Sequence, residues 1–245
     1  MRGTSFEFRF RVLIIFAIYF LGFYAPWERY PATSPVEPLW SWLAILIAHL
    51  GWLPTRDAYV AVTAAAILCM VIGAFLRVWG TAYLGHSVMR DARMHAHTVL
   101  AAGPYRHVRN PLYEGNWFTA VATSILMPPT GALFFVVALT VFLLRLIGGE
   151  EAHLAAVQGE TYLDYRKHVP RLIPSLKASV PSSGAQPAWL PSLVAEVYSI
   201  AITLCFAVFA WRYDALLLIR CVLICFGISM VIHALMPRHL PVQQA

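Results

Sequence analysis

The chain has 245 residues and a net charge of +6; 60% of its residues are hydrophobic and only 12% are charged. Because roughly a quarter of the residues of an ordinary soluble domain are charged, this composition excludes that class. Since a bilayer also excludes an open sheet, the sequence predicts an all-α polytopic integral membrane protein with about six or seven transmembrane helices and an amphipathic interfacial helix.

Residues 1–97 are expected to hold the N-terminal transmembrane helices and a polar loop. A retained helix is predicted from Val12 to Tyr24, because no small-residue cleavage site follows it. The apolar run from Leu39 to Leu53 covers only ~22 Å as a helix, so it either spans with difficulty or re-enters the same face. A clear span is predicted from Ala58 to Val78, and a loop with a short helix from Trp79 to Thr98.

The polar loop contains a His-x-His pair, His95 and His97, which suggests a metal site. No third ligand lies nearby in the sequence, so solvated loop residues are the better interpretation. The cysteines all lie within apolar runs and lack the spacing of a zinc site or a disulfide framework. We therefore expect no metal.

Two apolar runs, Leu112 to Met127 and Thr130 to Leu146, are expected to form a helical hairpin. Pro128-Pro129 supplies its turn, because proline ends one helix and can start the next. Gly148-Gly149 should then loosen the backbone before an amphipathic stretch, Glu150 to His168, which predicts a helix lying in the membrane interface. The hairpin brings the polar stretches on its two sides to one membrane face.

The C-terminal part of the chain is predicted to be an accessory. Residues 176–191 are rich in Ser, Pro and Ala and predict a linker. Residues 192–245 should form a pair of transmembrane helices, from Ser192 to Trp211 and from Ala215 to Met236.

The polar stretches beside the hairpin carry the candidate site. The first is Gly103-Pro104-Tyr105-Arg106-His107-Val108-Arg109-Asn110-Pro111-Leu112-Tyr113-Glu114-Gly115. The second begins at Glu150-Glu151, passes Gly159, Tyr162 and Tyr165, and ends with Val169-Pro170-Arg171-Leu172-Ile173-Pro174. An arginine of this set could bind a carboxylate with its fork of donors, a glutamate could accept from an ammonium or from ribose hydroxyls, and the tyrosines offer apolar faces with polar tips.

This order of motifs resembles the isoprenylcysteine carboxyl methyltransferase family, which is related to membrane phospholipid N-methyltransferases. The resemblance covers residues 98–175, the expected methyltransferase core, and implies an integral membrane enzyme that uses S-adenosylmethionine. The carboxyl methyltransferases usually have His where this chain has Asn110. A neutral amide cannot titrate, so a positioning role, not proton transfer, is implied there.

The resemblance also implies the site residues. The catalytic residues would be Arg109, Asn110, Tyr113 and Glu151. The cofactor-binding residues would be Gly103, Tyr105, Arg106, Arg109, Asn110, Gly115, Glu150, Glu151, Tyr162, Tyr165 and Arg171. Glu114 either favours the helix N-terminus through the dipole or faces the substrate.

The acceptor implied is a lipid or an isoprenoid-linked compound, with a carboxylate slightly favoured over the amine of a phospholipid N-methyltransferase. A membrane reductase of the sterol-reductase type and a non-enzymatic membrane scaffold stay open. Binding of S-adenosylhomocysteine, of NADPH or of neither would separate the three.

Charge distribution predicts the orientation. Lys and Arg gather beside the motifs, and cytoplasmic loops are enriched in these residues, so the active site is expected on the cytoplasmic side of a bacterial-type inner membrane or its equivalent. Membrane topology accounts for the positive charge without nucleic acid. The side of the N-terminus stays undecided, because it depends on whether Leu39–Leu53 spans.

Overall fold

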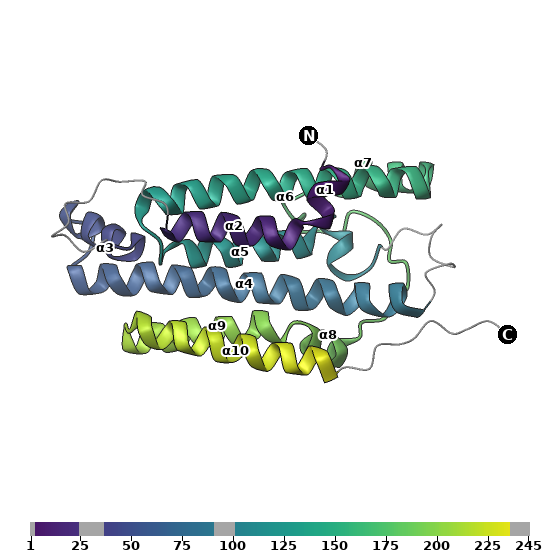
Figure 1. Cartoon of the computed structure of the whole chain (residues 1–245). Coiled ribbons are helices and arrows are strands. Elements are labelled where there is room, and N and C mark those ends of the chain that lie inside the picture. The colour runs from purple at the N-terminus through teal and green to yellow at the C-terminus, as the bar shows by residue number, and fades with distance from the viewer. Residues whose placement is uncertain (1–2, 25–36, 91–100, 236–245) are drawn as a thin grey trace.

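The computed structural model describes residues 3–24, 37–90 and 101–235. Within these ranges every regular element is a helix, which confirms the all-α prediction. Six helices lie along one another in an elongated bundle: α2 (Arg11–Tyr24), α4 (Thr55–Arg90), α5 (Pro111–Ser124), α6 (Pro129–Gln158), α9 (Val197–Arg212) and α10 (Ala215–Leu235) (Figure 1). The shorter elements are α1 (Ser5–Arg9), α3 (Leu39–His49), the 3-10 turn η1 (Gly103–Arg106), α7 (Glu160–His168) and α8 (Trp189–Ala195).

The bundle has two ends. The motif end carries η1, the start of α5, the end of α6 and α7, whereas the far end carries α3 and the start of α4 (Figure 1). The Leu39 N–H donates to the Met127 carbonyl at 2.8 Å, so α3 begins beside the turn between α5 and α6. Ala44 of α3 packs on Ala58 in the first turn of α4. The short α3 therefore stays at the far end, and α2 begins at the motif end.

Two of the described helices are long and apolar enough to cross a membrane. They are α4 over Thr55–Leu84 and α6 over Pro129–Gln158. The pair of α8 and α9 would add a third span if the two helices, bent by 65°, form one broken span. Length and composition alone thus support two or three spans in the described chain.

The predicted hairpin is confirmed at its turn. Pro128 is the N-cap of α6 and Pro129 its first residue, a position where the missing N–H of proline costs nothing. Helix α5 packs closely on α4 because glycine lies at the contact. A Cβ on Gly115 would lie 2.7 Å from the Gly73 carbonyl oxygen and 2.6 Å from Cγ of Arg77. Small residues of this kind allow backbones to approach in membrane bundles.

Two predicted helix limits are wrong, because both helices run further than their sequence breaks suggest. α4 continues through the expected loop to Arg90, while the remainder of that loop, with His95 and His97, lies outside the described residues. α6 passes through Gly148-Gly149 without a break and ends only at Gly159. A glycine costs a helix about 1 kcal/mol, and packing outweighs this cost here, since Gly148 is buried.

The segment between α7 and α8, which the sequence predicts to be a linker, is held against the first motif stretch by backbone hydrogen bonds. Backbone N–H groups of Ser175, Ser179 and Ser183 donate to carbonyls of the first motif stretch and its approach, at 3.0, 2.8 and 2.8 Å. The predicted span from Ser192 is interrupted at Glu196, where α8 ends and α9 begins. This bend places the Glu196 carboxylate 2.6 Å from Nε of Arg77 in α4.

Candidate functional site

A buried carboxylate joins the two motif stretches at the motif end. Glu151, only 3% exposed, accepts from Nε of Arg109 at 2.9 Å and from the amide of Asn110 at 3.3 Å through one oxygen. Its other oxygen accepts from Nε and Nη2 of Arg171 at 3.1 and 2.6 Å. The structure therefore brings together four predicted site residues, which we call the Glu151 cluster: Arg109, Asn110, Glu151 and Arg171.

The Glu151 cluster also closes the loop after α7 onto the first motif. Nη1 of Arg109 donates to the carbonyl of Val169 at 2.9 Å and to that of Arg166, and the Arg109 N–H donates to the Pro170 carbonyl at 3.0 Å. The hydrogen bonds to Glu151 raise the pKa of Arg171 above its usual value. Because both oxygens of Glu151 are engaged, this residue positions its neighbours in the structure and has little free capacity for a ligand.

The neighbouring Glu150 has a different environment. It accepts one hydrogen bond, from the Tyr113 hydroxyl at 2.9 Å, and both residues line a groove of about 820 Å³. This groove, which we call the motif-end groove, lies within the roughly 300–1,000 Å³ typical of ligand pockets. Its apolar wall is formed by side chains of four helices, namely Phe8, Val12, Ile15, Leu112, Leu143 and Leu146. Arg11, Arg77, Asn116 and His153 add polar groups.

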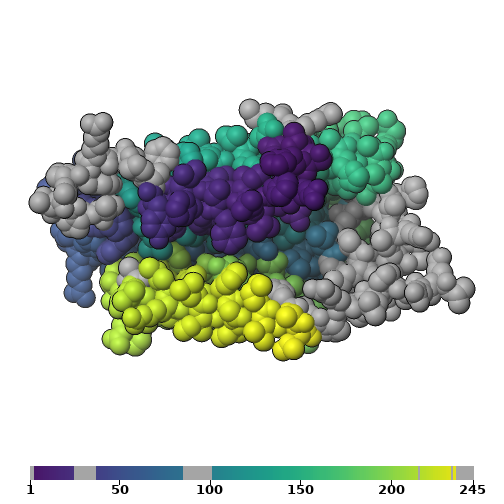
Figure 2. All heavy atoms as spheres, in the orientation of Figure 1, coloured from purple at the N-terminus to yellow at the C-terminus, as the bar shows by residue number. Residues whose placement is uncertain are grey.

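The N-terminal helices form one wall of this groove. Phe8 of α1 lies where a Cβ on Gly149 would be, at 2.4 Å. Nε of Arg145 donates to Glu7 at 2.6 Å, and the Gly3 N–H donates to the Arg145 carbonyl at 2.7 Å. In the space-filling view the purple N-terminal helices cover part of the teal hairpin (Figure 2). These contacts bring Arg11, at the start of α2, to the same groove as Glu150.

Several residues predicted to bind the cofactor pack beneath the motif end and do not line the motif-end groove. Tyr162 and Tyr165 are buried with Val169, and the Tyr165 hydroxyl donates to the Tyr105 carbonyl at 2.7 Å. Burial raises the pKa of Tyr162 to about 12. Arg106 points toward the linker and donates to the Val180 carbonyl at 2.9 Å.

The two predicted glycines have packing explanations. Gly103 has φ of +53°, a left-handed conformation that L side chains rarely adopt, and a Cβ there would lie 2.3 Å from the Tyr83 ring. Gly115 lets α5 approach α4, as described above. Contact of either glycine with a cofactor stays a prediction.

Carboxylates in proteins are usually either exposed to water or paired with hydrogen-bond donors, and Glu114 is neither. It is 6% exposed, and both of its carboxylate oxygens are buried without a hydrogen-bond partner among the described residues. No N–H of the α5 N-terminus therefore binds this carboxylate, and Asn110 is the N-cap. An unpaired buried acid of this kind is destabilising.

Sequence reasoning missed three polar residues that the structure places at the motif end: Arg11, His153 and Glu196. Arg11 and Glu196 lie far in sequence from the motifs, so only the fold brings them close. Glu196 carried a usable signal, because a carboxylate within an apolar run is a candidate for a functional or structural partner. Its partner Arg77 lies near the end of the span predicted from Ala58 to Val78.

These features define a helical protein with membrane-capable helices and a polar, groove-lined motif end. Residues 65–156 match the profile of the isoprenylcysteine carboxyl methyltransferase (ICMT) family, which confirms the resemblance predicted from the motifs. The matched region differs from the expected one at both ends: it includes most of α4 and stops before α7. No solved structure matches significantly.

Named relatives fall into two groups. Protein-S-isoprenylcysteine O-methyltransferase of Rattus norvegicus is 28% identical over 149 residues, which cover 58% of this chain and 51% of that protein. The protein of that name in Schizosaccharomyces pombe is 33% identical over 116 residues, covering 46% and 48%. Methanethiol S-methyltransferase 2 of Bradyrhizobium diazoefficiens is 33% identical over 155 residues, covering 62% and 54%. The chain thus spans about half the length of the curated relatives it matches.

Proposed function

We propose that this protein is an S-adenosylmethionine-dependent membrane methyltransferase that acts on a lipid or isoprenoid-linked acceptor, with a carboxylate as the preferred acceptor group. The observation that carries the proposal is the motif-end groove. It joins Tyr113 and Glu150 of the matched region to a long apolar wall, so one cavity offers polar groups for a reacting head and apolar surface for a hydrocarbon tail.

The groove has the donors and acceptors that the cofactor requires. Glu150 offers a carboxylate with one accepted hydrogen bond, which leaves capacity for an ammonium group or for ribose hydroxyls. Arg11 has no ion pair among the described residues and could hold a carboxylate through its fork of donors. When bound, the cofactor supplies an electrophilic methyl group on a sulfonium, and its own leaving group.

The residues of the chain would orient the reactants and exclude water. Tyr113 and Glu150 would contact the ligands, whereas Arg109, Asn110, Glu151 and Arg171 would hold the first motif against α6 as positioning residues. The Glu151 cluster holds the start of α5, and with it Tyr113, because Arg109 and Asn110 lie just before that helix and both donate to Glu151 of α6. Direct contact of the cluster with the cofactor would require one of these hydrogen bonds to be exchanged.

A thiol acceptor is the second candidate. The relatives named methanethiol S-methyltransferase support it, and one of them covers slightly more of this chain than the rat O-methyltransferase does. A small thiol would leave the long apolar wall of the groove unused, and this is why we place the lipid-linked carboxylate first.

We also propose the arrangement in the membrane. Helices α2, α4, α5, α6, α9 and α10 would cross, α3 would stay at the far end, and the motif end would face the cytoplasm because Lys and Arg gather there. Residues 98–175 would form the methyltransferase core between the N-terminal helices and the C-terminal helix pair.

A labelling experiment tests the activity. Membranes containing the protein are incubated with methyl-labelled S-adenosylmethionine and then separated into lipid, protein and water-soluble fractions. Base-labile label in the lipid or prenyl-protein fraction supports the carboxylate; base-stable label in phospholipid would favour the amine, and a volatile thioether the thiol. Binding of NADPH in place of S-adenosylhomocysteine would contradict the methyltransferase proposal.

Variants of Glu150 test the site. Glu150→Gln removes the charge that would bind the ammonium or ribose and should weaken S-adenosylhomocysteine binding about 10- to 100-fold, the loss of one charge-assisted hydrogen bond. Glu160→Gln, an exposed glutamate at the start of α7, is the matched control and should bind normally. Equal affinity in both variants would remove Glu150 from the site.

A further inference from the structure

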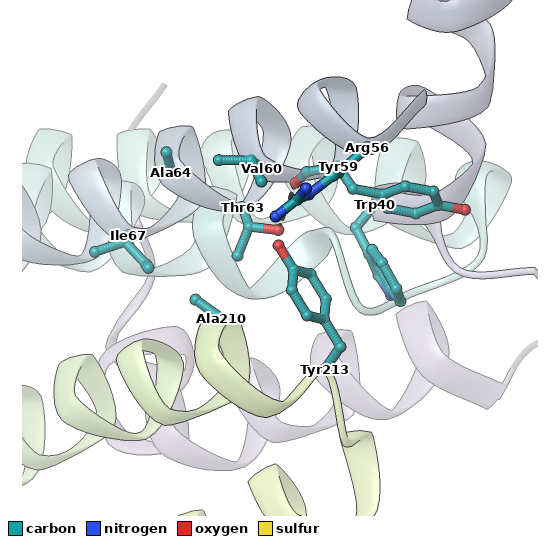
Figure 3. A pocket seen from close by; sticks show the side chains of 9 residues that line it. All are labelled: Trp40, Arg56, Tyr59, Val60, Thr63, Ala64, Ile67, Ala210 and Tyr213. Atoms are coloured by element: carbon teal, nitrogen blue, oxygen red, sulfur yellow. Dashed lines mark hydrogen bonds between the residues drawn. The ribbon is translucent and has the colours of Figure 1, made fainter. Parts of the chain in front are cut away.

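A second groove lies at the far end of the bundle, at the opposite end of α4 from the motifs. Its volume is about 530 Å³, and it is lined by residues of α3, α4 and α9 together with Tyr213, which follows α9. Figure 3 shows α4 and α9 on its two sides, with Arg56, Thr63 and Tyr213 directing polar groups toward the same space. We call it the far-end groove.

The mouth of the far-end groove offers donors to an anion. Arg56 is exposed and has no ion pair among the described residues. The Tyr213 hydroxyl likewise has no hydrogen-bond partner in that part of the chain. Thr63, in contrast, donates to the Tyr59 carbonyl at 2.8 Å, and its hydroxyl can therefore only accept. An arginine and a free hydroxyl form a donor set suited to a phosphate.

The floor of the groove is apolar and follows one face of α4. Val60, Ala64 and Ile67 continue from Arg56 at helical spacing, and Ala210 of α9 faces them. From Arg56 to Ile67 the helix rises ~16 Å, about half the ~30 Å hydrocarbon core of a bilayer. The groove therefore has the length of one leaflet, with its charge at the outer end and its apolar surface toward the bilayer centre.

The end of α9 positions the Tyr213 ring beside the far-end groove. Tyr213 has φ of +51°, a left-handed conformation that is unfavourable for a bulky L residue, and it is the one such residue among those described. Its ring centroid lies 5.8 Å from that of Trp40 and 5.9 Å from that of Phe209. Tyr213 is the C-cap of α9, and its N–H donates to the Phe209 carbonyl at 2.6 Å, so this conformation ends the helix. Here the conformation aims the Tyr213 ring into the groove (Figure 3).

We propose that the far-end groove binds one phospholipid with an anionic headgroup, its phosphate held by Arg56 and Tyr213 and one acyl chain lying along Val60, Ala64 and Ile67. Charge complementarity selects the headgroup, since the described residues that line the groove include a cation and no carboxylate. The length of the apolar floor selects a lipid over a free phosphate. The site is separate from the motif-end groove, because the two lie at opposite ends of α4.

The proposal is tested on the full chain reconstituted in nanodiscs of phosphatidylcholine with a minor fraction of phosphatidylglycerol. Lipids that stay bound after transfer to detergent are counted by native mass spectrometry. The wild type should retain phosphatidylglycerol above its share in the mixture. Arg56→Gln should lower this enrichment about fivefold, the effect of one arginine at a lipid headgroup. Arg212→Gln removes a cation at the same end, one that lies over the Trp211 ring outside the groove, and should leave the enrichment unchanged.

Two further variants keep the proposal falsifiable if Arg56→Gln fails to fold. Ala64→Phe fills the apolar floor and should abolish retention of the lipid, while Tyr213→Phe keeps the ring and should weaken retention without abolishing it, because it removes one donor to the phosphate. Absence of enrichment in the wild type, or equal enrichment in all variants, would overturn the proposal. So would equal retention of phosphatidylcholine, or competition by inorganic phosphate as effective as that by phosphatidylglycerol.

Discussion

The end of α6 and the start of α5 each bury a glutamate at the same end of the bundle, and the two have opposite surroundings. Glu151 and Glu114 are 3% and 6% exposed, so burial does not distinguish them. Glu151 accepts hydrogen bonds from three side chains, whereas neither oxygen of Glu114 has a partner in the part of the chain that the structure describes. One carboxylate is therefore expected to hold the fold together, and the other to weaken it.

The difference follows from where the partners come from. The donors to Glu151 lie on the first motif and on the loop after α7, so its charge is neutralised by segments that meet only in the folded chain. Glu114 lies on the first turn of α5, beside the close contact of that helix with α4, and no described side chain donates to it. The lesson is that a buried acidic side chain supports a structure only when the fold brings donors to it.

The largest expected effect comes from removing the paired carboxylate. Glu151→Ala leaves Arg109 and Arg171 without their shared partner and should lower the free energy of unfolding by about 3 kcal/mol, the lower part of the range for a broken buried pair, because Arg171 is half-exposed and can be hydrated. Unfolding in detergent by denaturant measures this loss. Glu150→Ala, one residue away with a single hydrogen bond, is the control and should cost less than about 1 kcal/mol.

Removing a second paired carboxylate, Glu196, should lower the free energy of unfolding slightly less. Glu196 accepts from Arg77 and from Thr81 and joins the C-terminal helices to α4. Glu196→Ala should lower the free energy of unfolding by about 2 kcal/mol, since the Arg77 side chain is 25% exposed and can recover some hydration. Limited proteolysis should then cut residues 176–191 faster than in the wild type. Unchanged cleavage would show that apolar packing alone holds the C-terminal pair.

Removing the unpaired acid, Glu114, should change the free energy of unfolding in the opposite direction. Glu114→Leu removes a buried group without a hydrogen bond and should raise the free energy of unfolding by about 1 kcal/mol. Thermal unfolding in detergent measures the gain, and a methyl-transfer assay on the same variant shows whether the acid also serves the reaction. A loss of stability would mean that Glu114 has a partner after all and that the contrast with Glu151 does not hold.

The smallest effect concerns an ion pair at the surface of the motif end. The hydrogen bond from Arg145 holds the pKa of Glu7 at about 2, below the usual 4.5. A lowered pKa stabilises the folded state above about pH 4.5, and this contribution is lost as the pH falls toward 2. Wild type and Glu7→Gln should therefore differ in thermal stability at neutral pH and converge in acid. A constant difference across that range would exclude Glu7 as its source.

Local patterns determined a good part of this protein. Hydropathy predicted the all-α class, Pro128-Pro129 predicted the hairpin turn, and the ordered motifs predicted the family that residues 65–156 match. The pairing of Arg109, Asn110 and Arg171 with Glu151 agrees with the grouping of the two motif stretches. Each of these features depends on residues close together in the sequence, or on motifs flanking one short hairpin.

Only the tertiary structure decided which residues share an environment. It made α6 continuous through Gly148-Gly149, where Gly148 is buried and Phe8 of α1 packs against Gly149. It paired Glu196 with Arg77 across 119 positions, and it separated Glu150, which faces a groove, from Glu151, which does not. Sequence periodicity reports the faces of single helices, whereas hydrogen-bond partners and groove walls come from helices far apart in the chain, and these meet only when the bundle has packed.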